Sequence, residues 1–263
     1  MTAMLASSRS DNRRDQQISS IADIIRNRLS SFGNRAAIRY DDGSTYKTVN
    51  FMEYVGNIDR TLRLFLPPSE NQYVVCTFVM NRPEWDMVAL ATLYSGNILF
   101  PLDTKMFDAE VKHLLEKSTP DFVLVSLTTR NRMKGYLKEL GLSPKILIAD
   151  MYGVFEDAQA PPIGQLEDHE ERLSALPFPS DGNFPEASER LERTDLVVAR
   201  YATSGTTTLP KVVQVTHGNV VAQVNEGMDV LNLRKAEDLL NIGPYTHIAT
   251  LLEFLVTKAK GFT

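Results

Sequence analysis

The sequence predicts an α/β fold built on a mostly parallel β-sheet with helices on both faces. Short unbroken apolar runs recur along the chain, at residues 73–78, 98–102, 122–125 and 146–148. Segments with helical periodicity separate these runs, so strands and helices alternate. Unbroken apolar strands are typical of sheets that are buried on both faces, and alternation with helices favours parallel pairing.

Helices are predicted where apolar residues recur on one face of a 3.6-residue period. The first begins after Asn50, a residue type that caps helix N-termini, and ends before Pro67-Pro68. The next has Pro83 in its first turn and runs towards Gly96. Further helices are predicted from Phe107 onward, over 131–140, and from Ile248 onward.

Two segments differ in composition from the predicted sheet. Residues 1–20 contain arginines and serines but lack the apolar centre of a secretory signal, and Asp11 and Asp15 argue against a transit peptide. They predict a polar, disordered tail. Residues 155–193 are acidic and proline-rich, which predicts a solvated surface connector within the domain. The single cysteine, Cys76, lies in an apolar run, where a buried and inert thiol is expected.

The balance of charge and hydrophobicity limits the partners. The 263 residues carry 28 basic and 33 acidic side chains, a net charge of -5, which argues against a nucleic-acid-binding surface. The sequence lacks a run of roughly 18 apolar residues, so no membrane span is predicted. We therefore expect an intracellular protein, cytoplasmic by default, with a peroxisome or another organelle left open.

The segment that carries chemistry begins after a strand predicted at 196–202. A loop follows, Thr203-Ser204-Gly205-Thr206-Thr207-Thr208-Leu209-Pro210-Lys211, and then a second strand at 212–215. Hydroxyl and backbone N–H donors can surround a polyphosphate, glycine allows close approach, and lysine adds a positive charge. A Walker A loop does not fit, because Pro210 precedes Lys211 and no Ser or Thr follows it. The sequence has no Gly-x-Gly-x-x-Gly for a dinucleotide fold either.

A Ser/Thr-rich turn is the simpler explanation of such a loop, and turns of this kind are common. The Pro-Lys pair and the helix start Thr216-His217-Gly218-Asn219 favour phosphate binding instead. The stretch from Tyr201 to Lys211 resembles the phosphate-loop signature of the adenylate-forming superfamily, which includes acyl-CoA ligases, luciferases and peptide-synthetase adenylation domains. Two further stretches resemble landmarks of that family: residues 81–103, with Asn-Arg-Pro-Glu-Trp and Pro-Leu-Asp, and residues 238–247, as a strand and a Pro-x-x-His loop.

The resemblance implies a partial N-terminal AMP-binding domain over residues 21–263. It implies ATP-dependent activation of a carboxylic acid, fatty or related, to acyl-AMP and then acyl-CoA, with ATP and CoA as co-substrates. Thr203 to Thr208 and Lys211 would hold the β- and γ-phosphates, and His247 would border the adenylate and the acyl pocket. His217 is expected to cap a helix, and no residue of the chain is assigned as catalytic.

The resemblance also predicts what these residues lack. The Mg²⁺ ligand, the ribose-binding aspartate, the hinge and a small C-terminal domain would follow Thr263, so the 263 residues alone are expected to be an inactive fragment. The family's loop glycines are replaced by Thr208 and Val212. A threonine costs about 1 kcal/mol or more where the backbone needs a positive φ.

Three alternatives stay open at this point. The acyl group could pass to a carrier-protein thiol instead of CoA, which a downstream carrier sequence would favour. The chain could instead be a non-catalytic nucleotide- or acyl-binding remnant, as Thr208 and Val212 suggest. An unrelated α/β protein with a chance Ser/Thr loop is the least favoured of the three.

Overall fold

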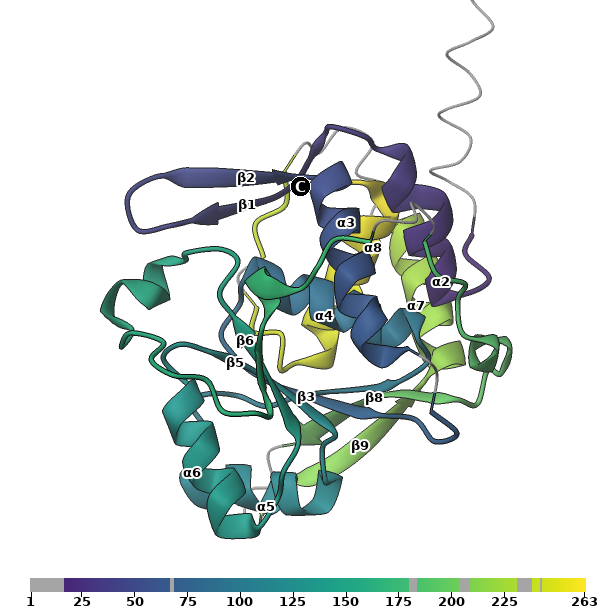
Figure 1. The fold of residues 1–263 in the computed structure, drawn as a ribbon. Helices are drawn as coiled ribbons and strands as arrows, with labels where there is room; N and C mark the ends of the chain where they lie inside the picture. Colours follow the sequence, from purple (N-terminus) through teal and green to yellow (C-terminus); the bar gives the residue numbers. More distant parts are fainter. Residues whose placement is uncertain (1–16, 67–68, 180–183, 204–208, 231–237, 242) are drawn as a thin grey trace, which may run out of the picture.

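A seven-stranded sheet forms the centre of the molecule, with strand order β7-β6-β5-β3-β4-β8-β9 (Figure 1). The computed structural model describes residues 17–66, 69–179, 184–203, 209–230, 238–241 and 243–263. The strands are β3 (Val74–Phe78), β4 (Ile98–Pro101), β5 (Phe122–Ser126), β6 (Lys145–Ala149), β7 (Glu170–Arg172), β8 (Val197–Thr203) and β9 (Lys211–Thr216). Neighbouring strands pair in parallel except β8 and β9, which are antiparallel. The predicted mostly parallel sheet is confirmed.

Helices cover both faces of this sheet, as predicted (Figure 1). One face carries α3 (Phe51–Leu62), α4 (Pro83–Tyr94), α7 (His217–Val230) and α8 (Ile248–Lys260), and the other carries α5 (Asp108–Ser118) and α6 (Arg130–Leu140). Each face has its own hydrophobic core. Val75 and Leu99 point into the first core, whereas Cys76 and Phe100 point into the second. This alternation follows from the two-residue period of a strand.

Helix α4 lies deepest in the molecule. All twelve of its residues are buried, because it packs between the sheet and α3. A helix that is apolar around its whole circumference is expected in the interior rather than at the surface. Two acidic residues in its first turn, Glu84 and Asp86, are buried with the rest.

A β-hairpin precedes α3 and was not predicted. It consists of β1 (Ala36–Asp41) and β2 (Tyr46–Asn50), which pair antiparallel. Asp42 Oδ1 accepts the backbone N–H groups of Ser44 and Thr45, and Gly43 adopts a φ of 88° in the turn. Most residues of β2 are exposed, so the hydrophobic alternation that would mark the strand in the sequence is weak.

The N-terminal segment packs against the first core. Helix α2 (Ile21–Asp23) continues as a π-helical turn over Ile24–Arg28 and a 3-10 turn over Leu29–Ser31. Most of the predicted tail, residues 1–16, lies outside the described residues. Of its last residues, Ile18 is buried and Ser20 caps α2 by accepting the N–H of Ala22 at 3.2 Å.

Most described residues of the segment 155–193 are exposed or half-buried, but the segment also contains regular structure that the sequence did not predict. It contributes β7 to the edge of the sheet, in parallel with β6. It also forms short 3-10 turns over Phe155–Gln159, Leu173–Ala175 and Glu189–Glu192. Elsewhere in the chain, a 3-10 turn over Arg63–Phe65 follows α3. Glu170 is buried, because the guanidinium of Arg130 pairs with its carboxylate. An acidic residue in this segment is therefore not always an exposed residue.

Candidate functional site

The predicted phosphate loop joins β8 to β9. Thr203 is the last residue of β8 and Lys211 the first of β9, and the two lie opposite each other in the antiparallel ladder. The Thr203 hydroxyl donates to the carbonyl of Lys211 at 3.4 Å. This pairing closes the loop at its base. The other predicted residues lie outside the described part of the chain: Ser204, Gly205, Thr206, Thr207 and Thr208.

Lys211 borders a cavity of about 430 Å³ next to α5. Lys117 and His113 of α5 and Arg200 of β8 also line this cavity. Within the described ranges, none of these four side chains forms an ion pair with an acidic group. Lys117, Arg200 and Lys211 are therefore cations without a counter-charge, and such a group produces a positive potential that attracts anions.

Val212, one of the two replaced loop glycines, lies within β9. It pairs with Ala202 and packs against the core on the α5 and α6 face. Among the described residues, Thr119 is the only non-glycine residue with a positive φ, so the backbone at Val212 is ordinary strand. A β-branched side chain therefore fits at this position without backbone strain. Thr208, the second replacement, lies outside the described residues.

The Asn-Arg-Pro-Glu-Trp segment holds the candidate acyl loop in place. Asn81 follows β3; its Nδ2 donates to the carbonyl of Gly243 at 2.7 Å, and its Oδ1 accepts the N–H of Tyr245 at 3.2 Å. The Trp85 ring stacks on the Tyr245 ring with centroids 3.9 Å apart. The Trp85 indole N–H donates to the hydroxyl of Thr77 on β3 at 2.9 Å. These contacts fix the loop at the carboxyl end of β3.

A buried ion pair lies at the same turn. The side chains of Arg82 and Glu84 are fully buried, with Nη2 and Oε1 3.1 Å apart, and Arg82 also pairs with Asp157. Glu84 Oε1 accepts the backbone N–H groups of Met151 and Tyr152 at 3.0 Å. The network joins the turn before α4 to the segment after β6, so we assign it a positioning role.

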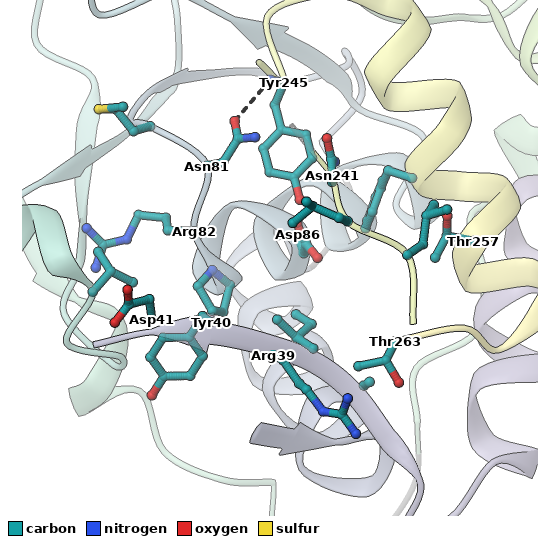
Figure 2. A pocket seen from close by; sticks show the side chains of 18 of the residues that line it. Arg39, Tyr40, Asp41, Asn81, Arg82, Asp86, Asn241, Tyr245, Thr257 and Thr263 are labelled. Atoms are coloured by element: carbon teal, nitrogen blue, oxygen red, sulfur yellow. Dashed lines mark hydrogen bonds between the residues drawn. The ribbon is translucent and has the colours of Figure 1, made fainter. Parts of the chain in front are cut away.

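A second cavity, of about 400 Å³, opens beside Tyr245 (Figure 2). Asp86 lines it and is only 3% exposed. Burial raises the pKa of Asp86 to about 6, although the charge of Lys258 and a hydrogen bond from Tyr245 act in the opposite direction. Lys258 is equally buried, and its ammonium donates to the carbonyl of Ala37 at 2.7 Å. Burial lowers the pKa of Lys258, and the charge of Asp86 counteracts this.

The two predicted histidines have different surroundings. His247 is exposed at the start of α8, where its backbone N–H donates to the carbonyl of Pro244 at 3.0 Å. Its role beside an adenylate stays a prediction. His217 is buried, and its Nε2 accepts the N–H of Ile21 at 3.2 Å. Burial lowers its pKa, which favours the neutral ring that accepts this bond. The histidine therefore caps α2, as well as beginning α7.

The strand expected at the start of the stretch 238–247 is wrong for residues 238–241, which form no strand. A strand needs a neighbouring strand to satisfy its backbone groups. Here the N–H of Leu239 donates to the carbonyl of Thr263 at 2.9 Å, and Leu240 is 83% exposed. The side chain of Asp238 pairs with Arg39 of β1.

The phosphate-loop base and the loop at Tyr245 border the same edge of the sheet. Strands β3 and β8 are both parallel neighbours of β4. Because adjacent strands are about 4.8 Å apart, the ends of β3 and β8 are separated by roughly 10 Å. Open α/β sheets bind ligands outside the carboxyl ends of their strands. Thr203 ends β8 and Asn81 follows β3, so this edge of the sheet is the candidate site.

Other kinds of site are not seen in the described parts of the chain. No group of three or more His, Cys, Asp and Glu side chains is arranged to hold a metal ion there. No helix in those ranges combines the length and apolarity that a bilayer crossing requires. The thiol of Cys76 is fully buried and burial raises its pKa, so it is not a nucleophile.

A match to a protein-family model identifies the family of the chain. Residues 26–263 match the model described as AMP-binding enzyme. The chain belongs to the AMP-binding enzyme family. Solved structures of adenylate-forming enzymes share its fold, including the mostly parallel sheet.

Three known proteins illustrate the likeness of this AMP-binding chain. It is 24% identical over 194 residues to probable 4-coumarate–CoA ligase 2 of Dictyostelium discoideum, across 71% of this chain and 34% of that protein. A putative long-chain-fatty-acid CoA ligase from Rhodopseudomonas palustris has a similar fold, with a TM-score of 0.70 and 20% identity over 92% of this chain and 56% of that chain. The A-PCP didomain of carboxylic acid reductase from Segniliparus rugosus, in complex with AMP, gives a TM-score of 0.71 and 19% identity over 97% of this chain. The chain covers 40% of that didomain, so it spans well under two thirds of each of these proteins.

Sequence reasoning missed the polar residues of the cavity beside Tyr245. Asp86 is one of two acidic residues, with Glu84, in a largely apolar helix, and the helix dipole also explains acidic residues in a first turn. Lys258 lies in the last turn of α8, where the same argument applies to a cation. Asn241 comes from a segment far along the chain from α4, which ends at Tyr94, so no local pattern connects it with Asp86.

Proposed function

We propose that this AMP-binding protein takes part in ATP-dependent activation of a carboxylic acid to acyl-AMP, followed by transfer of the acyl group to CoA. The observation that supports this most strongly is the pairing of Thr203 with Lys211. It closes a loop of hydroxyl residues at the carboxyl edge of a parallel sheet. Similarity to two CoA ligases supports CoA as the acceptor.

The donor groups of the loop fit a nucleotide triphosphate. In the activation step, a carboxylate oxygen attacks the α-phosphorus of ATP and pyrophosphate leaves, so two anions must approach each other. Catalysis of such a step requires positioning and neutralisation of negative charge. Hydroxyl and N–H groups of residues 203–208 would hold the phosphates, and Lys211 would supply positive charge. Mg²⁺ would add charge neutralisation, and we assign it no ligand among the described residues.

A carrier-protein thiol is a second candidate acceptor. The similarity to an A-PCP didomain favours it, because that structure joins a related fold to a further domain. Both acceptors share the same first step, so ATP binding is the property that both proposals require.

Calorimetric titration with ATP tests the proposal. We expect saturable binding of ATP to the 263-residue chain. Lys211→Ala should weaken this binding at least about tenfold, because it removes one charge-assisted contact to the phosphates. Lys145→Ala is the matched control, because Lys145 begins β6 at the amino edge of the sheet and pairs with Glu171. Equal ATP affinity in all three proteins would contradict the proposal.

A further inference from the structure

The cavity between α5 and β9 is lined by cations that have no counter-charge. Lys117 lies in the last turn of α5, Arg200 lies within β8, and Lys211 begins β9. Among the described residues, no acidic side chain lines this cavity or pairs with these three cations. Arg200 is half-buried, so its guanidinium is partly removed from water. Such a charge is costly unless an opposite charge replaces the water, and the cavity is therefore suited to an anion.

Two side chains of the sheet face this cavity from neighbouring strands. Arg200 of β8 and Gln214 of β9 are directly opposite each other in the antiparallel ladder. Ala202 and Val212, two residues away on the same strands, pack against the core on the α5 and α6 face. Because side chains alternate with a period of two, Arg200 and Gln214 point to that face as well. The guanidinium and the amide therefore supply donors side by side.

The cavity extends from the phosphate loop towards the opposite edge of the sheet. Lys211 lies opposite Thr203, at the carboxyl edge where the loop is closed. Lys117 lies near the amino edge, because α5 ends at Ser118, shortly before β5 begins at Phe122 (Figure 1). An anion that leaves the loop at Lys211 therefore meets further positive charge along this face.

The lining excludes several kinds of ligand. No Phe, Tyr or Trp is found among the described residues that border the cavity, so a nucleobase has no aromatic ring on which to stack. Pro210 and Val212 are the apolar residues there, which leaves little surface for an acyl chain. An amine or a metal ion would have no counter-charge. A small anion without a large organic part fits these walls.

The spacing of the donors favours an anion with more than one phosphoryl group. Lys211 and Gln214 are three residues apart on β9, which is about 10 Å along an extended strand. Arg200 lies level with Gln214, since the two residues pair. A single phosphate contacts donors at one end of this distance, whereas two linked phosphoryl groups offer oxygens to both ends. Ammonium and guanidinium groups form charge-assisted hydrogen bonds with such oxygens.

We propose that this cavity binds inorganic pyrophosphate outside the phosphate loop, as the anion that leaves ATP in the activation step. The proposal rests on the proposed function for the source of the pyrophosphate. Arg200, Gln214 and Lys117 hold the anion, and Lys211 lies at the boundary between the loop and the cavity. Positive charge beyond Lys211 favours the departure of pyrophosphate from the loop.

Calorimetry with two inorganic anions tests the binding. Pyrophosphate and orthophosphate are titrated separately into the whole chain, without ATP and at constant ionic strength, because salt screens exposed charges. We expect one pyrophosphate per chain, bound at least about tenfold more tightly than orthophosphate, the difference of one charge-assisted contact. No binding of pyrophosphate, or equal affinity for the two anions, would overturn the proposal.

Charge reversal at two matched lysines locates the bound anion. Lys117 and Lys138 are both exposed, and they lie in the last turns of α5 and α6. Lys117→Glu should weaken pyrophosphate binding about tenfold. Lys138→Glu makes the same change in net charge away from the cavity and should leave the affinity unchanged. If Lys117→Glu has no larger effect than Lys138→Glu, the anion is not in this cavity and the proposal is wrong.

A third variant examines the half-buried guanidinium. Arg200→Gln keeps a polar side chain but removes the charge, and we expect it to weaken pyrophosphate binding about tenfold. Circular dichroism shows whether this variant folds. Lys117→Glu alters an exposed side chain and decides the matter if it does not. Full affinity for pyrophosphate in folded Arg200→Gln would contradict the assignment.

The outcome is separable from the test of the proposed function. The pyrophosphate titrations contain no nucleotide and are read from Lys117 and Arg200, whereas the ATP titration is read from Lys211. Intact ATP binding without the expected pyrophosphate binding refutes the product site only. Pyrophosphate binding that responds to Lys117→Glu, in a chain that does not bind ATP, refutes the activation chemistry as the source of the anion and leaves the anion site.

Discussion

At the scale of single residues, the most unusual feature is a carboxylate kept inside an apolar helix. Asp86 is almost fully buried, and burial is the largest influence on it, raising its pKa from 3.8 to about 6. The nearby charge of Lys258 and the hydrogen bond from Tyr245 limit this shift. The residue therefore destabilises the fold when it ionises, which is a common property of groups kept for binding rather than for stability.

This shift predicts how stability depends on pH. Because the folded-state pKa of Asp86 lies above its unfolded value of 3.8, the folded protein binds more protons than the unfolded chain between about pH 4 and pH 6. The contribution of Asp86 to the free energy of unfolding is complete below this window and falls by about 3 kcal/mol as the pH rises through it. Asp86→Asn removes this titration, so its stability relative to the native chain should increase by that amount from pH 3.5 to pH 7.

Urea unfolding at a series of pH values measures this difference. Asp168→Asn is the control, because Asp168 is exposed in the connector and should give a nearly constant difference. A stability difference for Asp86→Asn that does not vary between pH 3.5 and pH 7 would show that the buried carboxylate is not titrating as described.

At the scale of elements, the sequence predicts what the local pattern determines. Unbroken apolar runs identified β3, β5 and β6, because strands buried on both faces need apolar residues at every position. Asn50 identified the start of α3, because its side chain accepts the N–H of Glu53 at 2.8 Å. The exposed strand β2 and the short edge strand β7 were missed, since long-range pairing rather than local composition stabilises them.

A buried ion pair joins strand β7 to α6. The Nε of Arg130 lies 2.7 Å from Oε1 of Glu170, whose side chain is fully buried, and hydrogen bonds from Arg130 lower the pKa of Glu170 to about 2. Glu170→Ala leaves a guanidinium without its counter-charge, and we expect a loss of about 3 kcal/mol in the free energy of unfolding. Denaturant unfolding at neutral pH measures it.

The neighbouring glutamate provides the comparison. Glu171 pairs with Lys145 but its side chain is 31% exposed, so Glu171→Ala should cost about 1 kcal/mol or less. Similar losses for Glu170→Ala and Glu171→Ala would show that the buried pair is not what attaches β7 to the sheet.

At the scale of the whole molecule, the fold brings together segments that no local pattern connects. The ends of β3 and β8 meet at one edge because both strands neighbour β4. The phosphate loop was found in the sequence because its donors are contiguous, whereas the cavity beside Tyr245 combines residues from β1, α4, α8 and residues 239–241. A site assembled from distant segments needs the sheet order before it can be recognised, which is why Asp86 and Lys258 were missed.

The central claim is that residues 203–211 hold the phosphates of ATP. Amide hydrogen exchange of the 263-residue chain, with and without ATP, tests it directly by mass spectrometry of peptides. With ATP bound, we expect slower exchange in the peptide that covers 203–211. This protection should be smaller in Lys211→Ala and absent from peptides of β6 and β7 on the far side of the sheet. Unchanged exchange at 203–211 under ATP concentrations that saturate the calorimetric signal, or protection confined to another region, would contradict it.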